Sequence, residues 1–555
     1  MTDLDRSARV AIFIIFLVWM ASVVLFLTPG VLLPDGAGYL SHLISAWADR
    51  DLVYFDQWAQ FGLVRGDLIL HKEVTRTGYL GNHWTVGSAL VWAPGFLIGD
   101  SVRSTFTPNS PANGISVPYN VAVIFTSAVA ALVALLISFS VARTSSGLSA
   151  ALLATLCGWF GTPLMWYALK NGTMAHAVSS CAAAVVVWLS LRLNQVRERA
   201  DLFATGLAIG FACTIRPQNA VLIVLPLMTV DRAARRDLIR QSGWFVLGGI
   251  TGALPQLVTS WFIYGNVFGF ATGGDARPFA AFERLWTWEP LFSWYHGLFT
   301  WTPFAAVGVI GLFLLLRSER RVAVAGLYLF FSQWMINAWL ERSFWGAHSF
   351  GQRRFDALLI FFILGAAALF RRVGIVGSTV LAAVTCGWTM LLFLAASRGL
   401  SLSSYLPFQQ LWSEGIQRAG LLTIRPLSMV PPSLRASVAA LVLLLLLAAI
   451  ALTLALGLAS KRFPGSLPAL GTAYLIAASA FLLFCGVHGG PALARWSRVA
   501  STNRALHLAR GGADIRVGLL KDEAEYLRLA GRDALAEETL RELQALVEKQ
   551  RGQIR

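Results

Sequence analysis

Acidic residues are scarce in this sequence: 29 Asp and Glu stand against 45 Lys and Arg in 555 residues, and charged residues make up 13% of the chain. A soluble domain carries roughly a quarter charged residues, so this composition excludes an ordinary soluble globular protein. The net charge of +16 does not indicate a nucleic-acid partner, because the basic residues fall in short clusters between apolar segments. The pattern is typical of a membrane protein.

Cysteine is rare as well. All five cysteines lie inside apolar runs, at Cys157, Cys181, Cys213, Cys386 and Cys485. Their spacing matches neither a metal site nor a disulfide framework. Internal repeats and low-complexity linkers are also absent from the sequence. These absences exclude a solenoid and a small secreted domain held together by disulfides.

Long hydrophobic runs, by contrast, are abundant: 56% of the residues are hydrophobic, including 35 Phe and 20 Trp, and the mean hydropathy is +0.63. A transmembrane helix needs about 20 apolar residues, and about thirteen such segments, two of them short, can be placed along the chain. We therefore predict an all-α fold, a polytopic transmembrane helical bundle. Residues 10–28 are expected to be a retained signal anchor, because no small-residue cleavage site follows them.

Two apolar stretches depart from a simple span. Residues 89–98 are too few to cross a membrane and contain Pro94-Gly95, so we expect a broken interfacial or re-entrant helix there. Residues 202–230 are too many for one upright helix and are interrupted by Arg216-Pro217-Gln218. Two short helices meeting at this break would place Arg216 in the membrane zone, where a cation needs a partner or an aqueous cavity.

The distribution of Arg and Lys predicts the topology. If the amino terminus is cytoplasmic and residues 89–98 do not span, nearly every short cytoplasmic turn is basic, and the acids of the first loop face the other side. These basic turns hold Arg143; Arg192, Arg197 and Arg199; Arg232, Arg235, Arg236 and Arg240; Arg317, Arg320 and Arg321; Arg371 and Arg372; Lys461 and Arg462. We expect a multi-pass protein of the bacterial cytoplasmic membrane whose first loop faces the periplasm or exterior.

The chain is expected to have two parts. Residues 1–490 form the transmembrane domain, in which residues 30–118 are a long first external loop with helices lying on the membrane. Residues 491–555 carry leucines at helical spacing among Glu, Arg and Lys, which predicts an external tail of amphipathic helices. The tail is interpreted as a solvated appendage in preference to a substrate-binding module.

The first loop begins with an acid in an unusual setting. Pro34 and the glycines Gly36 and Gly38 would end the first span and let the backbone turn tightly, which places Asp35 at the lip of the bundle. A carboxylate in that position is a candidate for proton abstraction or cation binding. Capping of the following helix is the simpler alternative.

Polar groups on the external side are concentrated in a few places, at or just within the mouths of predicted spans. Such placement is unfavourable unless the groups line one aqueous cavity. Arginine binds phosphate oxygens with two donors, and a carboxylate can take the proton of an attacking hydroxyl, so the set suits a substrate with a phosphate leaving group. An ion-coupled transporter would use the same residue types. The candidates for substrate binding are His83, Arg216, Gln218, Glu289, His348, Arg353 and Arg354.

Several short motifs resemble, in the same order along the chain, those of bacterial C-type (GT-C) membrane glycosyltransferases, the protein-mannosyltransferase-like and aminoarabinose-transferase-like superfamily. They are Trp345-Gly346-Ala347-His348-Ser349-Phe350-Gly351-Gln352-Arg353-Arg354-Phe355, Asp35-Gly36-x-x-Tyr39-Leu40, Asn82-His83 through Pro94, Gly206-Leu207-Ala208 through Arg216-Pro217, and Gly297 through Pro303. The resemblance implies transfer of a sugar from a polyprenyl-phosphate carrier to an acceptor hydroxyl, normally with inversion.

The resemblance also implies roles for single residues. The catalytic base would be Asp35, and Arg216 with the Arg353/Arg354 pair would meet the carrier phosphate. Many relatives carry a second acid between the third and fourth spans, where this chain has Lys170, Asn171 and His176. We expect either His176 or Asp56 to take that place.

A bound metal is left open at this stage. Asp35 with His176 or His83 could bind a divalent cation that screens the phosphate, but two or three unlinked ligands form no metal motif.

Three hypotheses follow. The leading one is a polyprenyl-phosphate-dependent glycosyltransferase acting on an envelope glycan, lipid or protein, with the sugar and the acceptor left open. A transporter or flippase of lipid-linked glycans is the alternative; it predicts inverted pseudo-symmetry and broken helices, and the sequence offers one such break, at Arg216. A scaffold acting through the tail is the third.

Overall fold

The structure is a computed structural model of the chain. It describes residues 6–31, 34–61, 64–65, 68–69, 74–195, 198–269, 286–340, 344–346, 349–419, 466–490, 492–493, 524, 528 and 533–554.

Helices dominate the amino-terminal half. The first span and the first loop contain α1 (Arg6–Phe26), α2 (Asp35–Ile44), the π-helical turn η1 (Ser45–Asp49), α3 (Phe55–Gln60), the strands β1 (Val64–Arg65) and β2 (Leu68–Ile69), and α4 (Gly87–Phe106). The next elements are α5 (Val117–Ser146), α6 (Leu148–Phe160), α7 (Leu164–Leu169), α8 (His176–Arg192), α9 (Arg199–Ile215), the 3₁₀ helix η2 (Pro217–Val224), α10 (Leu225–Thr229), α11 (Arg232–Arg240) and α12 (Ser242–Tyr264).

In the described residues of the carboxy-terminal half, the regular elements are all helices. Its elements are α13 (Glu289–Phe292), α14 (Leu298–Trp301), α15 (Phe304–Leu315), α16 (Arg320–Met335), the π-helical turn η4 (Ile336–Leu340), the 3₁₀ helix η5 (Arg353–Leu358), α17 (Leu359–Ala396), α18 (Phe408–Ala419), α20 (Ser466–His488) and α23 (Asp533–Ile554).

The predicted all-α membrane bundle is confirmed. Among the described residues, six helical segments are long and apolar enough to cross a membrane, namely Arg6–Phe26, Val117–Ser146, Ser242–Tyr264, Arg320–Leu340, Arg353–Ala396 and Ala469–His488. Shorter apolar helices such as α8 and α15 stand among them. The predicted count of about thirteen spans stays a prediction, since the segment expected at residues 436–458 lies outside the described residues.

The long segment at α17 is a helical hairpin. Gly374 has φ +73° and interrupts the helix, and Ser378 Oγ donates a hydrogen bond of 3.0 Å to the Phe370 carbonyl. The second half returns toward the starting end, because the Phe393 ring lies 6.2 Å from that of Phe350. Two separate spans predicted here, residues 355–370 and 373–396, therefore correspond to the two halves of the hairpin.

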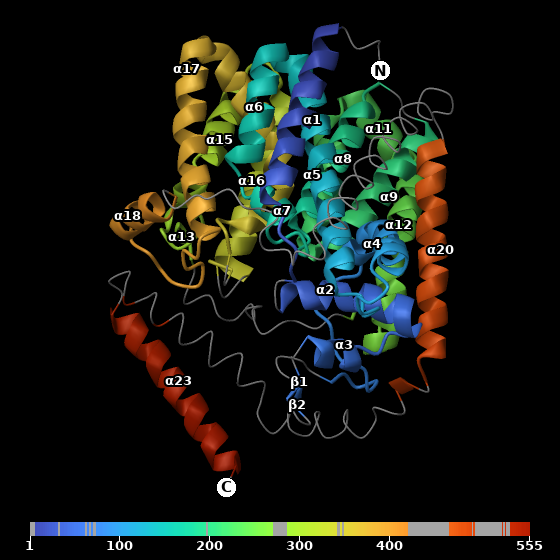
Figure 1. The fold of residues 1–555 in the computed structure, drawn as a ribbon. Helices are drawn as coiled ribbons and strands as arrows, with labels where there is room; N and C mark the ends of the chain where they lie inside the picture. Colours follow the sequence, from blue (N-terminus) through green and yellow to red (C-terminus); the bar gives the residue numbers. More distant parts are fainter. Residues whose placement is uncertain are drawn as a thin grey trace.

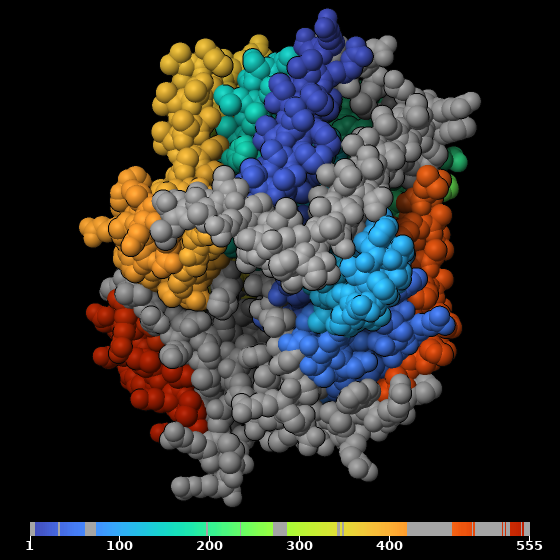
Figure 2. All heavy atoms as spheres, in the orientation of Figure 1, coloured from blue at the N-terminus to red at the C-terminus, as the bar shows by residue number. Residues whose placement is uncertain are grey.

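The elements of the first loop gather at one end of the bundle. Figure 1 places α2, α3 and the β1–β2 hairpin at the end opposite the start of α1, and α11 near the latter. In the space-filling view the first-loop helices and α20 lie on one side of this end, and α18 and α23 on the other (Figure 2). We call it the loop end.

One expectation about the first loop is wrong. The sequence predicted that Pro94 breaks a short helix. Instead, α4 is one helix of 20 residues that runs through Pro94. Pro94 removes one backbone donor, whereas packing supports the helix: a Cβ on Gly95 would lie 2.1 Å from the Thr126 hydroxyl of α5, so the two helices are in close contact. The helix is not among the segments apolar enough to span a membrane, in agreement with its predicted interfacial position.

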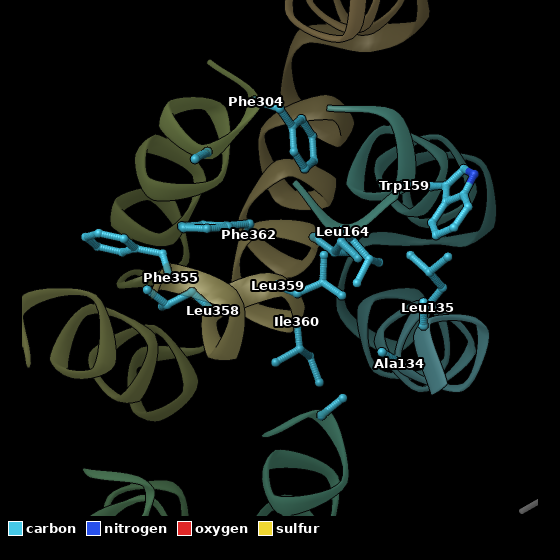
Figure 3. Packing of buried hydrophobic residues seen from close by; sticks show 14 of the residues in the cluster. Ala134, Leu135, Trp159, Leu164, Phe304, Phe355, Leu358, Leu359, Ile360 and Phe362 are labelled. Atoms are coloured by element: carbon cyan, nitrogen blue, oxygen red, sulfur yellow. The ribbon is translucent and has the colours of Figure 1, made fainter. Parts of the chain in front are cut away.

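Buried side chains hold the bundle around the α17 hairpin. Leu359 and Phe362 of α17 lie near Leu164 of α7 and Phe304 of α15, and all four are buried in one apolar cluster (Figure 3). Elsewhere the helices approach through glycine: a Cβ on Gly206 of α9 would lie 1.9 Å from the Phe245 carbonyl of α12. Helices in membranes often pack through such close backbone contact. Lipid tails are as apolar as the side chains, so the hydrophobic effect does not drive the helices together there.

Candidate active site

Asp35 and Arg353 form an ion pair at the loop end. Asp35 lies in the first turn of α2 and not at its N-cap, which is Pro34. Arg353 Nη1 lies 3.1 Å from Asp35 Oδ2, although the two residues are 318 positions apart. Their side chains remain 21% (Asp35) and 13% (Arg353) exposed. Each therefore keeps access to a substrate.

Small residues let α2 approach the core at this point. A Cβ on Gly36 would lie 2.6 Å from the Thr173 hydroxyl, so the first turn of α2 rests on the turn that precedes α8. This contact brings Asp35 close to the start of α8, where His176 is the first helical residue. The glycines beside Asp35 thus allow close packing, whereas the tight turn predicted from them is not made there, because Gly36 and Gly38 lie within α2 and neither has a positive φ.

The motif before η5 is folded so that Arg353 faces Asp35. Gly346 and Gly351 have φ of +65° and +60°, a backbone region that favours glycine. Gln352 Nε2 donates 2.7 Å to the Phe344 carbonyl, and the Phe350 amide donates 2.9 Å to the Tyr167 hydroxyl. These bonds fix both ends of the motif, and η5 then begins at Arg353.

A second acid, Asp356, lies one turn further along and is fully enclosed by donors. Arg216 Nη1 donates to Asp356 Oδ2, and His176 Nδ1 donates to the same oxygen over 2.7 Å. Ser179 Oγ donates 3.2 Å to Asp356 Oδ1, and Ser180 Oγ donates 3.0 Å to the Asp356 carbonyl. The Asp356 side chain is only 6% exposed. A charge buried in this way is stable only with such partners.

The predicted break at Arg216 is confirmed. α9 ends at Ile215, Arg216 is extended at φ −149° and ψ 123°, and η2 begins at Pro217. With its amide oriented to present the oxygen, Gln218 accepts 3.0 Å from Arg216 Nε. The guanidinium is therefore held by Gln218 on one side and by Asp356 on the other.

A cavity lies between these groups and the apolar core. The space that the centre of a water-sized sphere can reach in it is about 30 Å³. The polar part of its wall includes Tyr167, His176, Gln352, Arg353 and Asp356, and the apolar part includes residues of α15 and α17. The His176 imidazole is anchored through Nδ1, which donates to Asp356, and the His176 side chain lines the cavity.

The structure thus brings together five of the predicted residues: Asp35, His176, Arg216, Gln218 and Arg353. The prediction missed Asp356, which joins two of them. One signal was available, since a carboxylate two residues after the arginine pair and at the start of an apolar run needs a partner. Its partners are 140 and 180 positions away in sequence, and no local pattern identifies them.

The other predicted residues lie in different surroundings. Asp56 is exposed in the first turn of α3, where its carboxylate accepts 3.1 Å from the Gln57 amide. The His83 ring lies 3.6 Å from that of Trp84, and Glu289 Oε2 accepts 3.0 Å from the Trp288 amide in α13.

Two members of the motif remain. Arg354 is buried at 7% exposure, and His348 lies outside the described residues. Within the described part of the chain, no three His, Cys, Asp or Glu side chains gather in a way that could hold a metal ion.

The fold and the site define a polytopic helical membrane protein with two acid–arginine pairs at the loop end of its bundle. Comparison with models of protein families and with curated protein sequences gives no match.

Solved structures with similar helix arrangements include ArnT from Cupriavidus metallidurans bound to undecaprenyl phosphate, at 14% identity and a TM-score of 0.41, covering 91% of this chain and 79% of that one. The apo state of the same protein gives 14% identity and a TM-score of 0.42 over 91% and 78%. The Archaeoglobus fulgidus oligosaccharyltransferase in the apo form gives 11% identity and a TM-score of 0.38 over 74% of this chain and 55% of that one.

Proposed function

We propose that this protein is a membrane glycosyltransferase that moves a sugar from a polyprenyl-phosphate donor to an acceptor hydroxyl, with Asp35 as the general base. The observation that carries the proposal is the Asp35–Arg353 pair: a carboxylate and a guanidinium meet at 3.1 Å while both stay partly exposed. The two residues belong to separate motifs that resemble membrane glycosyltransferases, which supports the same reaction.

The reaction assigns opposite tasks to the two side chains. Arg353 binds phosphate oxygens of the donor and stabilises the charge that grows there as the bond between the anomeric carbon and the phosphate oxygen breaks. The acceptor oxygen attacks that carbon from the opposite face, which inverts its configuration. Asp35 removes the proton of the acceptor hydroxyl as the new bond forms.

The buried pair has a supporting role in this scheme. Asp356 neutralises Arg216 and holds His176 by Nδ1. Both side chains are thereby fixed beside the cavity, which favours a preorganised site over one assembled on binding. We assign Arg216 and His176 to binding of the donor and Asp356 to positioning both.

The distribution of basic residues indicates which side of the membrane the site faces. Arg232, Arg235 and Arg240 lie on α11, at the end of the bundle opposite the first loop (Figure 1). Because basic residues favour the cytoplasmic side, we assign the loop end and its site to the external face of a bacterial cytoplasmic membrane.

The test is mass spectrometry of envelope glycans and lipid-linked sugars from a strain that lacks this protein, complemented with wild type or Asp35→Asn. We expect one sugar to be missing from the envelope, its polyprenyl-phosphate donor to accumulate, and only wild type to restore transfer. An intact sugar pattern with accumulation of a completed lipid-linked glycan would contradict the proposal and favour a transporter.

A further inference from the structure

Tyr39 shares a helix face with Asp35. It follows Asp35 by four residues in α2, and residues at this spacing lie one above the other on a helix surface. The Asp35 carboxylate and the Tyr39 side chain therefore point to the same side of α2. That side faces Arg353, as the contact of Asp35 with Arg353 shows.

Aromatic neighbours fix the Tyr39 ring. Its centroid lies 6.0 Å from that of Trp92, edge to face, and 6.4 Å from that of Trp84. A Cβ on Gly38 would lie 1.8 Å from the Trp84 ring, so α2 is pressed against this indole. The ring is held by packing, and its position does not depend on the hydroxyl.

The hydroxyl itself is in a different situation. Tyr39 is 9% exposed, and among the described residues no hydrogen-bond partner of its hydroxyl is recorded. The nearby charges that act on this group are those of Arg216, Asp35, Arg353 and Asp356. The phenol thus lies within electrostatic range of both ion pairs, and its hydroxyl makes no hydrogen bond among the described residues.

The chemistry of the phenol limits its role. Burial raises the pKa of Tyr39 to about 12, against the opposing influence of Arg216. The group therefore keeps its proton at any physiological pH and can donate a hydrogen bond. It is unsuited to act as a base.

The charges of the two ion pairs indicate which kind of group would accept a hydrogen bond from the Tyr39 hydroxyl. The two arginines and the two acids sum to zero, so an anion entering this region gains little from net charge and depends on directed donors. A phosphate that leaves a sugar gains charge during the reaction, and a donor aimed at its oxygen stabilises the transition state more than the ground state.

We infer that Tyr39 is a further substrate-binding residue, whose hydroxyl donates a hydrogen bond to a phosphate oxygen of the lipid-linked donor. The inference rests on the proposed function, since it names a contact to the same donor.

The test compares Tyr39→Phe with Tyr54→Phe in the full-length protein reconstituted in lipid nanodiscs. Tyr39→Phe removes the hydroxyl and keeps the ring between Trp84 and Trp92. Tyr54 is a matched control in the same loop, because its hydroxyl lies 2.8 Å from His42 Nδ1. The probe is farnesyl phosphate, a short prenyl phosphate, and its affinity is measured by native mass spectrometry.

We expect Tyr39→Phe to weaken farnesyl phosphate binding by about tenfold to a hundredfold, since hydrogen bonds to charged groups are worth about 1.5–3 kcal/mol. Tyr54→Phe should bind as wild type does, even if it unfolds at a lower temperature.

Wild-type affinity in Tyr39→Phe would overturn the inference, and so would an equal loss in both variants. If wild type itself does not bind farnesyl phosphate, the proposed donor fails and the inference with it. Sugar transfer by wild type together with unchanged binding in Tyr39→Phe would leave the proposed function intact and reject the inference alone.

Discussion

The two acid–arginine pairs of the candidate active site are built differently. Asp35 and Arg353 touch through one contact of 3.1 Å and keep 21% and 13% of their side chains exposed. Asp356 and Arg216 keep only 6% and 10%, and His176 and Ser179 also bond the acid. The first pair is open to a substrate, and the second is enclosed by the protein.

The difference separates two tasks that the sequence alone cannot tell apart. Partly exposed ion pairs contribute little to stability, typically about 0–1 kcal/mol. A buried acid with several donors is different, because removing one partner leaves a charge without compensation. We therefore assign the chemistry to the open pair, and within the enclosed pair we assign positioning to Asp356. Substitutions of the two acids and of Arg353 test this division.

Asp35→Asn should have the largest effect on activity. Loss of a general base slows a reaction by about 10²- to 10⁴-fold, and the partly exposed pair should leave the folding stability almost unchanged. Sugar transfer and thermal unfolding are measured on the same purified variant. Asp49→Asn, in the same loop and bonded to Gln57, is the control and should transfer at the wild-type rate. An active Asp35→Asn protein would end the assignment of the base.

Asp356→Asn, in contrast to Asp35→Asn, should greatly reduce the folding stability. The amide keeps the shape of the side chain but leaves the buried Arg216 without a counter-charge, which costs about 3–5 kcal/mol. Chemical denaturation of the purified protein measures the difference. Ser180→Ala removes one neutral hydrogen bond and should cost only about 1 kcal/mol. Equal stability of Asp356→Asn and wild type would remove the distinction between the two pairs.

Arg353→Lys should have an intermediate effect. Lysine keeps the charge but not the planar fork that binds two phosphate oxygens at once. The expected loss of transfer is about tenfold to a hundredfold, in line with a change of about 1.5–3 kcal/mol for a charged hydrogen bond, and stability should change little. Initial rates at several donor concentrations measure it. Unchanged rates would indicate that Arg353 does not meet the phosphate.

The smallest effect concerns a cation paired with neither acid. Lys170 Nζ donates 2.9 Å to Thr28 Oγ1, and burial, with a contribution from Arg398, lowers the pKa of Lys170 to about 8. The unfolded chain then holds this proton between pH 8 and about 10.5, where the folded protein has lost it. Stability should therefore rise with pH across this window. Lys170→Met should flatten the rise in thermal unfolding experiments, and an identical pH profile would contradict the lowered pKa.

The sequence predicted those parts of the site that depend on local patterns. The helix break at Arg216-Pro217 was predictable because proline has no backbone N–H to continue the helix. The positions of Asp35 and Arg353 were predictable because their motifs lie at the ends of apolar runs. What it missed depends on distant contacts. Asp356 is explained by partners on α8 and at the end of α9, and the continuity of α4 through Pro94 depends on packing against α5.

The direct test of the central claim uses purified protein in lipid nanodiscs, supplied with lipid-linked sugars and with envelope acceptors from a strain that lacks the protein. Released polyprenyl phosphate and the newly formed glycoside are quantified together for wild type and Asp35→Asn. The account predicts equal amounts of both products from wild type and neither from a folded Asp35→Asn protein. Equal product formation by the two proteins, or no cleavage of any lipid-linked sugar by wild type, would contradict it.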